Sequence, residues 1–203
     1  MSKTTVILIR HGETDWNASG RWQGHSDIPL NDNGIQQAKL LARRLTSWPI
    51  KALYSSDLKR AARTASILGD ALGLQPDFDA SWRERNGGEF EGLQAADLMG
   101  HRDFQTQRRD KNWAPPGGES NVQVASRVQI AFDKLLEDHP DQMVAVVSHG
   151  GAIITLLSLV VGFPPGERAR IWVSGNTGFS IVEVGKRGPI LVRLNDVTHL
   201  DSD

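Results

Sequence analysis

The chain has 203 residues, a formal net charge of −1 and a hydrophobic fraction of 39%, values typical of a soluble domain with its own core. No excess of positive charge supports nucleic-acid binding. The absence of cysteine excludes disulfides, thiolate metal sites and cysteine nucleophiles. Residues 1–9 do not resemble a signal peptide, and the longest apolar run, 152–161, is about half the ~20 residues of a membrane span. We expect a cytoplasmic protein with no nucleic-acid or membrane partner, no cofactor and no metal.

Hydrophobic periodicity predicts an alternation of strands and helices along the chain. The serine-rich stretch 55–57 is predicted to cap the helix that follows it, and the S-x-x-Q sequence at 120–123 is predicted to form a capping box. The predicted elements are a strand at 5–9, a helix at 35–48, a strand at 52–54, a helix at 58–72, a helix from 121 to 136, a strand at 144–147, a buried helix at 152–161 and an antiparallel hairpin of strands 181–184 and 190–194.

Residues 93–116 differ from this alternation. They are polar, contain one weak helical stretch and run into a Pro-Pro-Gly-Gly sequence, which is typical of a segment outside the core. We therefore predict one α/β domain over residues 1–203. Its fold is a three-layer sandwich in which helices flank a mostly parallel central sheet, with an antiparallel edge and a small lid at about 93–116.

Two His-Gly dipeptides directly follow predicted buried strands. His11 and Gly12 follow the first strand, and His149 and Gly150 follow the strand at 144–147. Ligands of open α/β sheets bind at the carboxyl ends of the strands. The two imidazoles are therefore expected at one edge of the sheet, with Arg10 beside the first of them.

Other residues near these dipeptides suit a phosphate group, which needs fixed cations and amide donors. Arg60 falls in the first turn of its predicted helix, where the helix dipole favours anions. Gly150 begins another helix and gives an anion close access to backbone amides. Glu84 can transfer a proton, with Glu89 and Glu91 as alternative donors. Imidazole can itself form a covalent intermediate.

Seven motifs support a more specific interpretation. They occur in the order LIRHGETDWN, RWQGHSDIPLNDNGIQQA, LYSSDLKRAARTA, WRERNGGEFEG, PPGGES, VVSHGG and GNTG. In this order, and over most of the chain, they resemble the histidine phosphatase superfamily, which includes phosphoglycerate mutases and broad-specificity phosphatases.

The resemblance implies a role for each matching residue. His11 corresponds to the nucleophile that becomes phosphorylated, and Glu84 to the proton donor. Arg10, Arg60 and His149 correspond to the rest of the phosphate pocket. The residues implied to line the phosphate and substrate site are Asn17, Gln23, Gly24, Gly150 and Asn176.

These roles place physical requirements on the side chains. His11 must present one unprotonated ring nitrogen, so a backbone acceptor is expected to hold its other N–H. His149, if protonated, would add a third positive charge to those of Arg10 and Arg60. Glu84 would protonate the leaving alcohol and then deprotonate the water that attacks phosphohistidine.

Three functions fit the resemblance. Mutases of this superfamily are usually longer, so the short lid and the end of the chain at Asp203 favour hydrolysis of a small phosphorylated metabolite. The alternatives are a 2,3-bisphosphoglycerate-dependent phosphoglycerate mutase and a non-catalytic module that binds phosphorylated ligands. Glu84 speaks against such a module, because binding alone does not need a proton donor.

Overall fold

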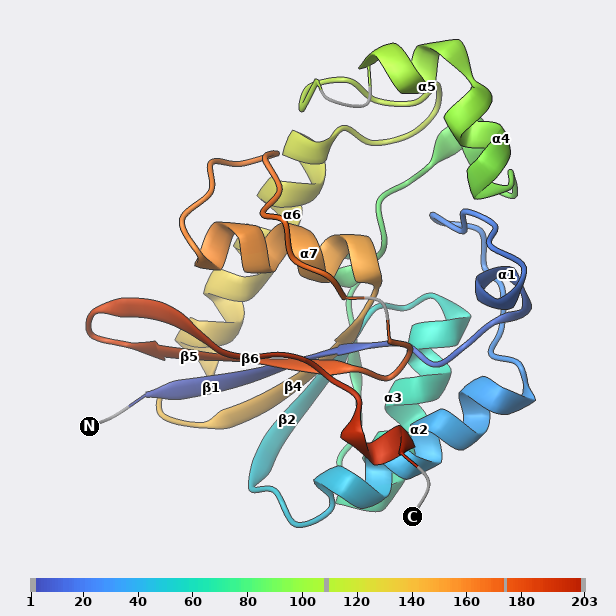
Figure 1. The fold of residues 1–203 in the computed structure, drawn as a ribbon. Helices are drawn as coiled ribbons and strands as arrows, with labels where there is room; N and C mark the ends of the chain where they lie inside the picture. The colour runs from blue at the N-terminus through green and yellow to red at the C-terminus, as the bar shows by residue number, and fades with distance from the viewer. Residues whose placement is uncertain (1–2, 108–109, 174, 202–203) are drawn as a thin grey trace.

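The computed structural model describes residues 3–107, 110–173 and 175–201, which form a three-layer α/β fold (Figure 1). Within these ranges a six-stranded sheet has the order β3-β2-β4-β1-β5-β6. Its strands are β1 (Thr4–Arg10), β2 (Ile50–Ser55), β3 (Asp77–Phe78), β4 (Met143–Ser148), β5 (Phe179–Gly185) and β6 (Gly188–Asp196). The pairs that join β3, β2, β4 and β1 are parallel, whereas β5 pairs antiparallel with both β1 and β6. The predicted mostly parallel sheet with an antiparallel edge is confirmed.

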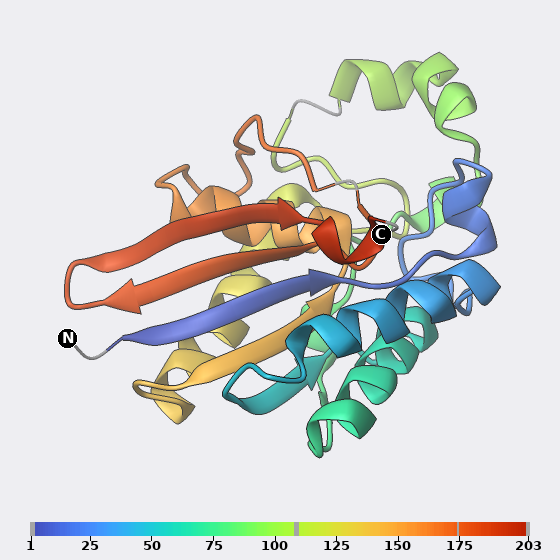
Figure 2. The same cartoon turned by 60° about the horizontal axis from the view of Figure 1, so that its bottom comes forward.

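Helices cover both faces of the sheet, as Figure 2 shows. The α-helices are α1 (Asp15–Ala18), α2 (Asp32–Leu45), α3 (Lys59–Leu72), α4 (Ala95–Gly100), α5 (Arg102–Gln107), α6 (Asn121–Asp138) and α7 (Gly150–Val160). Short 3₁₀ helices are η1 (Ala80–Trp82), η2 (Gly88–Phe90) and η3 (Thr198–Leu200). In the described part of the chain, no helix is both long and apolar enough to cross a membrane.

Strand β1 lies between the two halves of the core. Val6 and Leu8 pack in the apolar cluster formed with α6 and α7, whereas Ile7 and Ile9 pack in the cluster formed with α2 and α3. Successive side chains of a strand point to opposite faces, so a continuous apolar run fills both layers. This is why the β-branched run is buried over its whole length.

The parallel pairing of β1 with β4 positions the two His-Gly dipeptides. Its register runs from Thr5 opposite Met143 to Arg10 opposite Ser148. Both strands therefore end at the same edge of the sheet, and each is followed by its histidine.

The sequence predicts side-chain caps at the start of α6 and of α3. The capping box of α6 is confirmed: the Ser120 hydroxyl accepts a hydrogen bond from the Gln123 N–H, and the Gln123 side chain accepts one from the Ser120 N–H. The prediction for α3 is confirmed in part. The Ser56 hydroxyl accepts the Leu58 N–H at 3.3 Å, whereas Leu58 occupies the cap position without a side-chain hydrogen bond of its own. The Lys59 N–H is accepted at 2.7 Å by Asp27 from a distant loop, which the sequence does not predict.

The predicted lid segment contains α4 and α5, which project away from the sheet beyond α1 (Figures 1 and 2). An aromatic cluster joins it to the rest of the protein. The Phe104 ring lies 5.9 Å from the Trp22 ring and 6.0 Å from the Phe90 ring, measured between centroids. Residues 108 and 109, within the predicted lid, lie outside the described residues. Opening and closing of this segment stays a prediction.

Candidate active site

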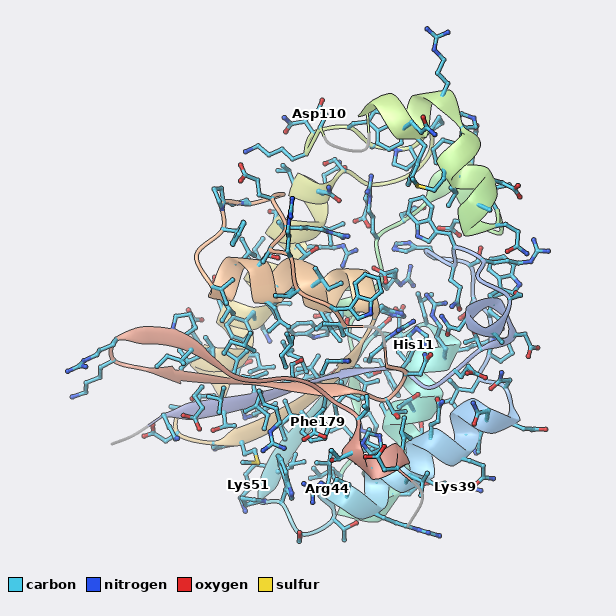
Figure 3. All side chains as sticks on the ribbon, viewed as in Figure 1. His11, Lys39, Arg44, Lys51, Asp110 and Phe179 are labelled. Carbon is cyan, nitrogen blue, oxygen red and sulfur yellow. The ribbon has the colours of Figure 1, made fainter. Side chains whose placement is uncertain are left out.

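His11 follows the last residue of β1 and is 3% exposed (Figure 3). Its Nδ1 lies 2.7 Å from the Gly12 carbonyl oxygen. A carbonyl can only accept a hydrogen bond, so Nδ1 carries the proton and Nε2 keeps its lone pair. This is the backbone acceptor that the sequence analysis predicts. The loop packs closely on α2: a Cβ added to Gly12 would lie 2.5 Å from the Gly34 carbonyl oxygen.

His149 lies directly behind His11, with ring centroids 5.0 Å apart. The side chain is fully buried. Its Nδ1 accepts a hydrogen bond from Nε of Arg60 at 3.2 Å, and its Nε2 lies 2.8 Å from the Ser56 hydroxyl. The neutral ring therefore carries its proton on Nε2 and donates it to Ser56. Ser56, which accepts the Leu58 N–H at the start of α3, therefore also orients this histidine.

Arg60 is a buried cation fixed by carbonyl groups. It lies in the first turn of α3 and donates hydrogen bonds to the Gly24 and Ser26 carbonyl oxygens, each at 2.7 Å. Burial lowers the pKa of its guanidinium to about 10, so the group remains charged at neutral pH. Arg10 contacts the Val173 carbonyl oxygen at 3.5 Å. These arginines supply positive charge close to the two imidazoles.

Both histidines are electrically neutral in this environment. Burial lowers the pKa of His11 well below 6.5, and the charges of Arg60 and Arg10 lower it further. Burial and the charge of Arg60 also lower the pKa of His149 well below 6.5. His149 therefore does not supply the third positive charge considered from the sequence. A neutral His11 has the lone pair that nucleophilic attack requires.

Glu84 borders the same cleft as His11, and two backbone groups orient its carboxylate. Its Oε1 accepts the Arg85 N–H and its Oε2 accepts the Gly151 N–H, each at 2.8 Å. The alternative donor Glu91 instead accepts the N–H groups of His25 and Ser26 at 2.6 and 2.7 Å. The Glu91 carboxylate thereby fixes the loop that contains His25 and Ser26. The geometry therefore favours Glu84 over Glu91 for contact with a substrate.

Sequence reasoning missed the residues that hold the loop around Glu84. Arg127 on α6 donates hydrogen bonds to the carbonyl oxygens of Ser81, Arg83 and Glu84 at 3.0, 2.8 and 2.8 Å. It also forms an ion pair with Glu119 at 2.8 Å. The only available signal was the position of Glu119 inside the PPGGES motif, and nothing in the helical pattern distinguished Arg127.

The cleft has a volume of about 600 Å³ and contains most of the predicted site residues. Those that line it are Arg10, His11, Asn17, Gln23, Gly24, Arg60, Glu84 and Gly150. His149 and Asn176 do not border it. The Asn176 side-chain amide donates to the His11 carbonyl oxygen at 3.1 Å, so it supports the His11 loop from behind.

The cleft is also lined by residues that the sequence analysis did not select. Its polar wall also contains Arg21, Arg85, Asn121, Gly151 and Arg168. Its apolar wall contains Trp22, Leu98, Phe104, Ile154, Trp172 and Val173. Leu98 and Phe104 belong to α4 and α5, so the lid segment forms part of the wall. Among the described residues, no group of three or more His, Asp or Glu side chains is arranged to hold a metal ion.

Comparisons with known proteins agree with the motifs. The family model of the histidine phosphatase superfamily (branch 1) matches residues 6–197. A probable phosphoglycerate mutase GpmB of Yersinia pestis is 36% identical over 205 residues, covering 97% of this chain and 94% of the relative.

Solved structures show the same fold. A mycobacterial glucosyl-3-phosphoglycerate phosphatase in complex with VO3 matches with a TM-score of 0.85 and 32% identity, covering 94% of this chain and 98% of the other. A phosphoserine phosphatase mutant from Entamoeba histolytica, in complex with phosphoserine, matches with a TM-score of 0.85 and 30% identity, covering 98% and 100%. The relatives are thus named as mutases or phosphatases.

The lowered pKa values of the buried histidines make the stability of the fold depend on pH. Below the ordinary histidine pKa of 6.5, the unfolded chain binds protons that the folded His11 and His149 rings do not bind. The free energy of unfolding is therefore expected to be retained above this pH and to decrease below it. Each ring contributes up to ~1.4 kcal/mol per pH unit.

Denaturant unfolding at about pH 7.5, 6.5 and 5.5 measures this dependence. His149→Gln removes one of these two rings and should flatten the decrease between about pH 6.5 and 5.5, to which the half-buried His199, whose pKa is also lowered by burial, adds a smaller part. A wild-type free energy of unfolding that does not decrease in this range would contradict the neutral state of the histidines, as would an unchanged slope in His149→Gln.

Proposed function

Starting from the fact that this chain belongs to the histidine phosphatase superfamily, we propose that it hydrolyses small phosphomonoesters through a phosphohistidine on His11. The observation that carries the proposal is the state of this side chain. Its Nδ1 proton is held by the Gly12 carbonyl group, and its unprotonated Nε2 belongs to a ring that borders the cleft beside Arg10 and Arg60. A nucleophile and fixed cations are thereby prepared for one phosphoryl group.

In the first step, the phosphoryl group of the substrate lies against the guanidinium groups of Arg10 and Arg60. Nε2 of His11 attacks phosphorus and forms the N–P bond while the bond from phosphorus to the ester oxygen breaks. Glu84 gives its proton to that oxygen, and the alcohol leaves neutral. Charge that develops on the equatorial oxygens is stabilised by the arginines.

In the second step, a water molecule replaces the alcohol beside Glu84. The Glu84 carboxylate takes a proton from the water as its oxygen attacks phosphorus. The N–P bond breaks, His11 regains its lone pair, and inorganic phosphate leaves. Glu84 ends protonated, ready for the next substrate. His149 is assigned a positioning role, because it holds Arg60 through Nδ1 and packs against His11.

A mutase is the second candidate function, favoured by the name of the Yersinia relative. Both reactions would share the first step. They differ in the acceptor of the phosphoryl group from phosphohistidine. In hydrolysis the acceptor is water, and in a mutase it is a free hydroxyl group of a phosphoglycerate.

Release of inorganic phosphate distinguishes the candidates. The purified protein is incubated with n-propyl phosphate, and separately with 3-phosphoglycerate in the presence of 2,3-bisphosphoglycerate. Hydrolysis predicts one phosphate released per ester consumed, and a loss of more than ~10³-fold in His11→Ala. Interconversion of phosphoglycerates without phosphate release would identify a mutase. Binding of phosphate esters without any turnover would identify a binding module.

Glu84→Gln tests the proton donor. The amide cannot donate the proton, so phosphorylation of the enzyme by an alkyl phosphate should slow by ~10²–10⁴-fold. Phosphorylation by p-nitrophenyl phosphate should slow far less, because nitrophenolate leaves as a stable anion. Rapid-quench measurement of both rates gives the comparison. The matched control is Glu89→Gln, which changes an exposed neighbour. Equal slowing with both esters, or the differential pattern in Glu89→Gln, would move the acid role away from Glu84.

A further inference from the structure

The turn at 175–178, which carries the GNTG motif, holds the main chain of the proposed nucleophile. The Thr177 N–H and the Asn176 side-chain amide both donate to the His11 carbonyl oxygen, at 3.2 and 3.1 Å. These two bonds fix the peptide group that joins His11 to Gly12. The Gly12 carbonyl oxygen is the acceptor of the His11 Nδ1 proton. The turn therefore controls the geometry on which the state of the His11 ring depends.

Thr177 has a backbone conformation that its side chain disfavours. Its φ angle is 58°, in the left-handed region, and the residue is fully buried. A β-branched residue rarely adopts this region, and such a conformation persists only where the surrounding structure holds it. The contacts that keep Thr177 in this conformation therefore also keep its N–H directed at His11.

The Thr177 hydroxyl group connects the turn to the C-terminal helix η3. It donates to the Asn176 carbonyl oxygen at 2.7 Å, since a carbonyl can only accept, and it lies 2.9 Å from Nε2 of His199. A hydroxyl has one proton, so Nε2 of His199 must donate the second hydrogen bond. Nδ1 of His199 is buried and has no hydrogen-bond partner among the residues that the structure describes. Burial lowers the pKa of this ring below 6.5, so it is neutral at neutral pH.

His199 is itself held in place by its surroundings. The Asp196 carboxylate accepts the Thr198 N–H at 3.0 Å and the Thr198 hydroxyl at 2.7 Å, which stabilises the start of η3. The centroid of the His199 ring lies 6.2 Å from that of the buried Phe179 ring, and η3 packs beside α2 (Figure 1). The Nε2–H of His199 is thus a fixed donor to Thr177.

Building on the proposed function, we propose that His199 and Thr177 are positioning residues for the nucleophile. His199 holds the Thr177 hydroxyl, which keeps the Thr177 backbone in the left-handed region, and the Thr177 N–H holds the His11 carbonyl oxygen. Neither residue lines the cleft. Both therefore act through His11 rather than by contact with the substrate.

Two substitutions of His199 separate its hydrogen bond from its packing. Phenylalanine keeps a ring beside Phe179 but has no donor, whereas the amide of glutamine can place an N–H close to the position of Nε2. Phosphorylation of His11, measured by rapid quench, should slow by roughly 10- to 100-fold in His199→Phe, because a displaced reacting group has effects of this size. His199→Gln should retain most of the rate. Unlike Glu84→Gln, His199→Phe should slow n-propyl phosphate and p-nitrophenyl phosphate by the same factor.

A double-mutant cycle tests whether His199 acts through Thr177. Thr177→Val removes the hydroxyl group, and in this background His199→Phe should change the rate by no more than about twofold. Thr177→Ser keeps the hydroxyl group and should retain the rate that Thr177→Val loses. This second pair of variants makes the same test if His199→Phe does not fold.

The matched control is His139→Phe. It removes a hydrogen bond of the same kind, because Nε2 of His139 lies 2.8 Å from the Tyr54 hydroxyl. His139 lies at the opposite end of β1 from His11, where Thr4 donates to its carbonyl oxygen. This variant should phosphorylate His11 at the wild-type rate.

The tautomer of His11 gives a readout that needs no substrate. Long-range proton–nitrogen NMR correlation of protein labelled with ¹⁵N-histidine reports both ring nitrogens, and His11→Ala assigns the signals. The wild type should carry the proton on Nδ1. In His199→Phe the two nitrogen shifts of His11 should move toward each other, because the Gly12 acceptor is displaced, whereas His199→Gln and His139→Phe should resemble the wild type.

Unchanged His11 nitrogen shifts in His199→Phe would overturn the inference, as would independent effects of His199→Phe and Thr177→Val that multiply. A wild type that forms no phosphohistidine, but whose His11 tautomer depends on His199, would contradict the proposed function and leave the positioning role supported. Phosphorylation of His11 at a rate that neither His199→Phe nor Thr177→Val changes would do the reverse.

Discussion

The parallel pairing of β1 with β4 is the constraint on which both the core and the site depend. Because Arg10 lies opposite Ser148, the following residues, His11 and His149, leave the sheet together. The same register sends alternate residues of β1 into the two apolar clusters. A shift by one residue would exchange the faces of the strand and separate the histidines. The hydrophobic free energy that stabilises the sheet therefore also fixes the 5.0 Å separation of the two rings.

The second organising feature is the way in which the protein holds buried positive charge. Among the described residues, no carboxylate oxygen lies within 4 Å of the Arg60 guanidinium. The carbonyl oxygens of Gly24 and Ser26 accept its hydrogen bonds instead. Glu91 in turn holds this loop through the N–H groups of His25 and Ser26. A cation partnered by dipoles keeps its full charge for an anionic ligand. Burial and this charge together keep both histidines neutral, so in the proposed reaction one arrangement would supply both electrostatic stabilisation and a nucleophilic lone pair.

Local patterns in the sequence predicted the parts of the fold that local physics determines. The run at 5–9 and the strand at 144–147 are apolar on both faces, which identified them as central strands, and the capping box of α6 follows from its own four residues. The start of α3 could be predicted only in part this way. Ser56 accepts the Leu58 N–H from two residues away, but Asp27 reaches the Lys59 N–H from a distant loop.

The grouping of most candidate site residues in one cleft could be predicted because these residues lie within continuous motifs. Some residues that the sequence analysis missed, such as Arg85 and Glu119, lie in these motifs without an assigned role, whereas Arg127 and Arg168 belong to no motif. Arg127 lies on a helix whose pattern gives no reason to single out this arginine, and Arg168 lies in an irregular segment after α7. Their contacts with the Glu84 region arise only when α6, α7 and the loop at 83–86 pack together. Tertiary structure, not local propensity, brings them to the cleft.

Trapping of the covalent intermediate tests the central claim most directly. The protein is mixed with radiolabelled substrate, quenched within milliseconds in base and digested, and the labelled peptide is identified. The account predicts an acid-labile, base-stable phosphoryl group on the peptide that contains His11, formed at least as fast as turnover and absent from His11→Ala. Label on any other residue, or steady release of phosphate from His11→Ala at the wild-type rate, would contradict it.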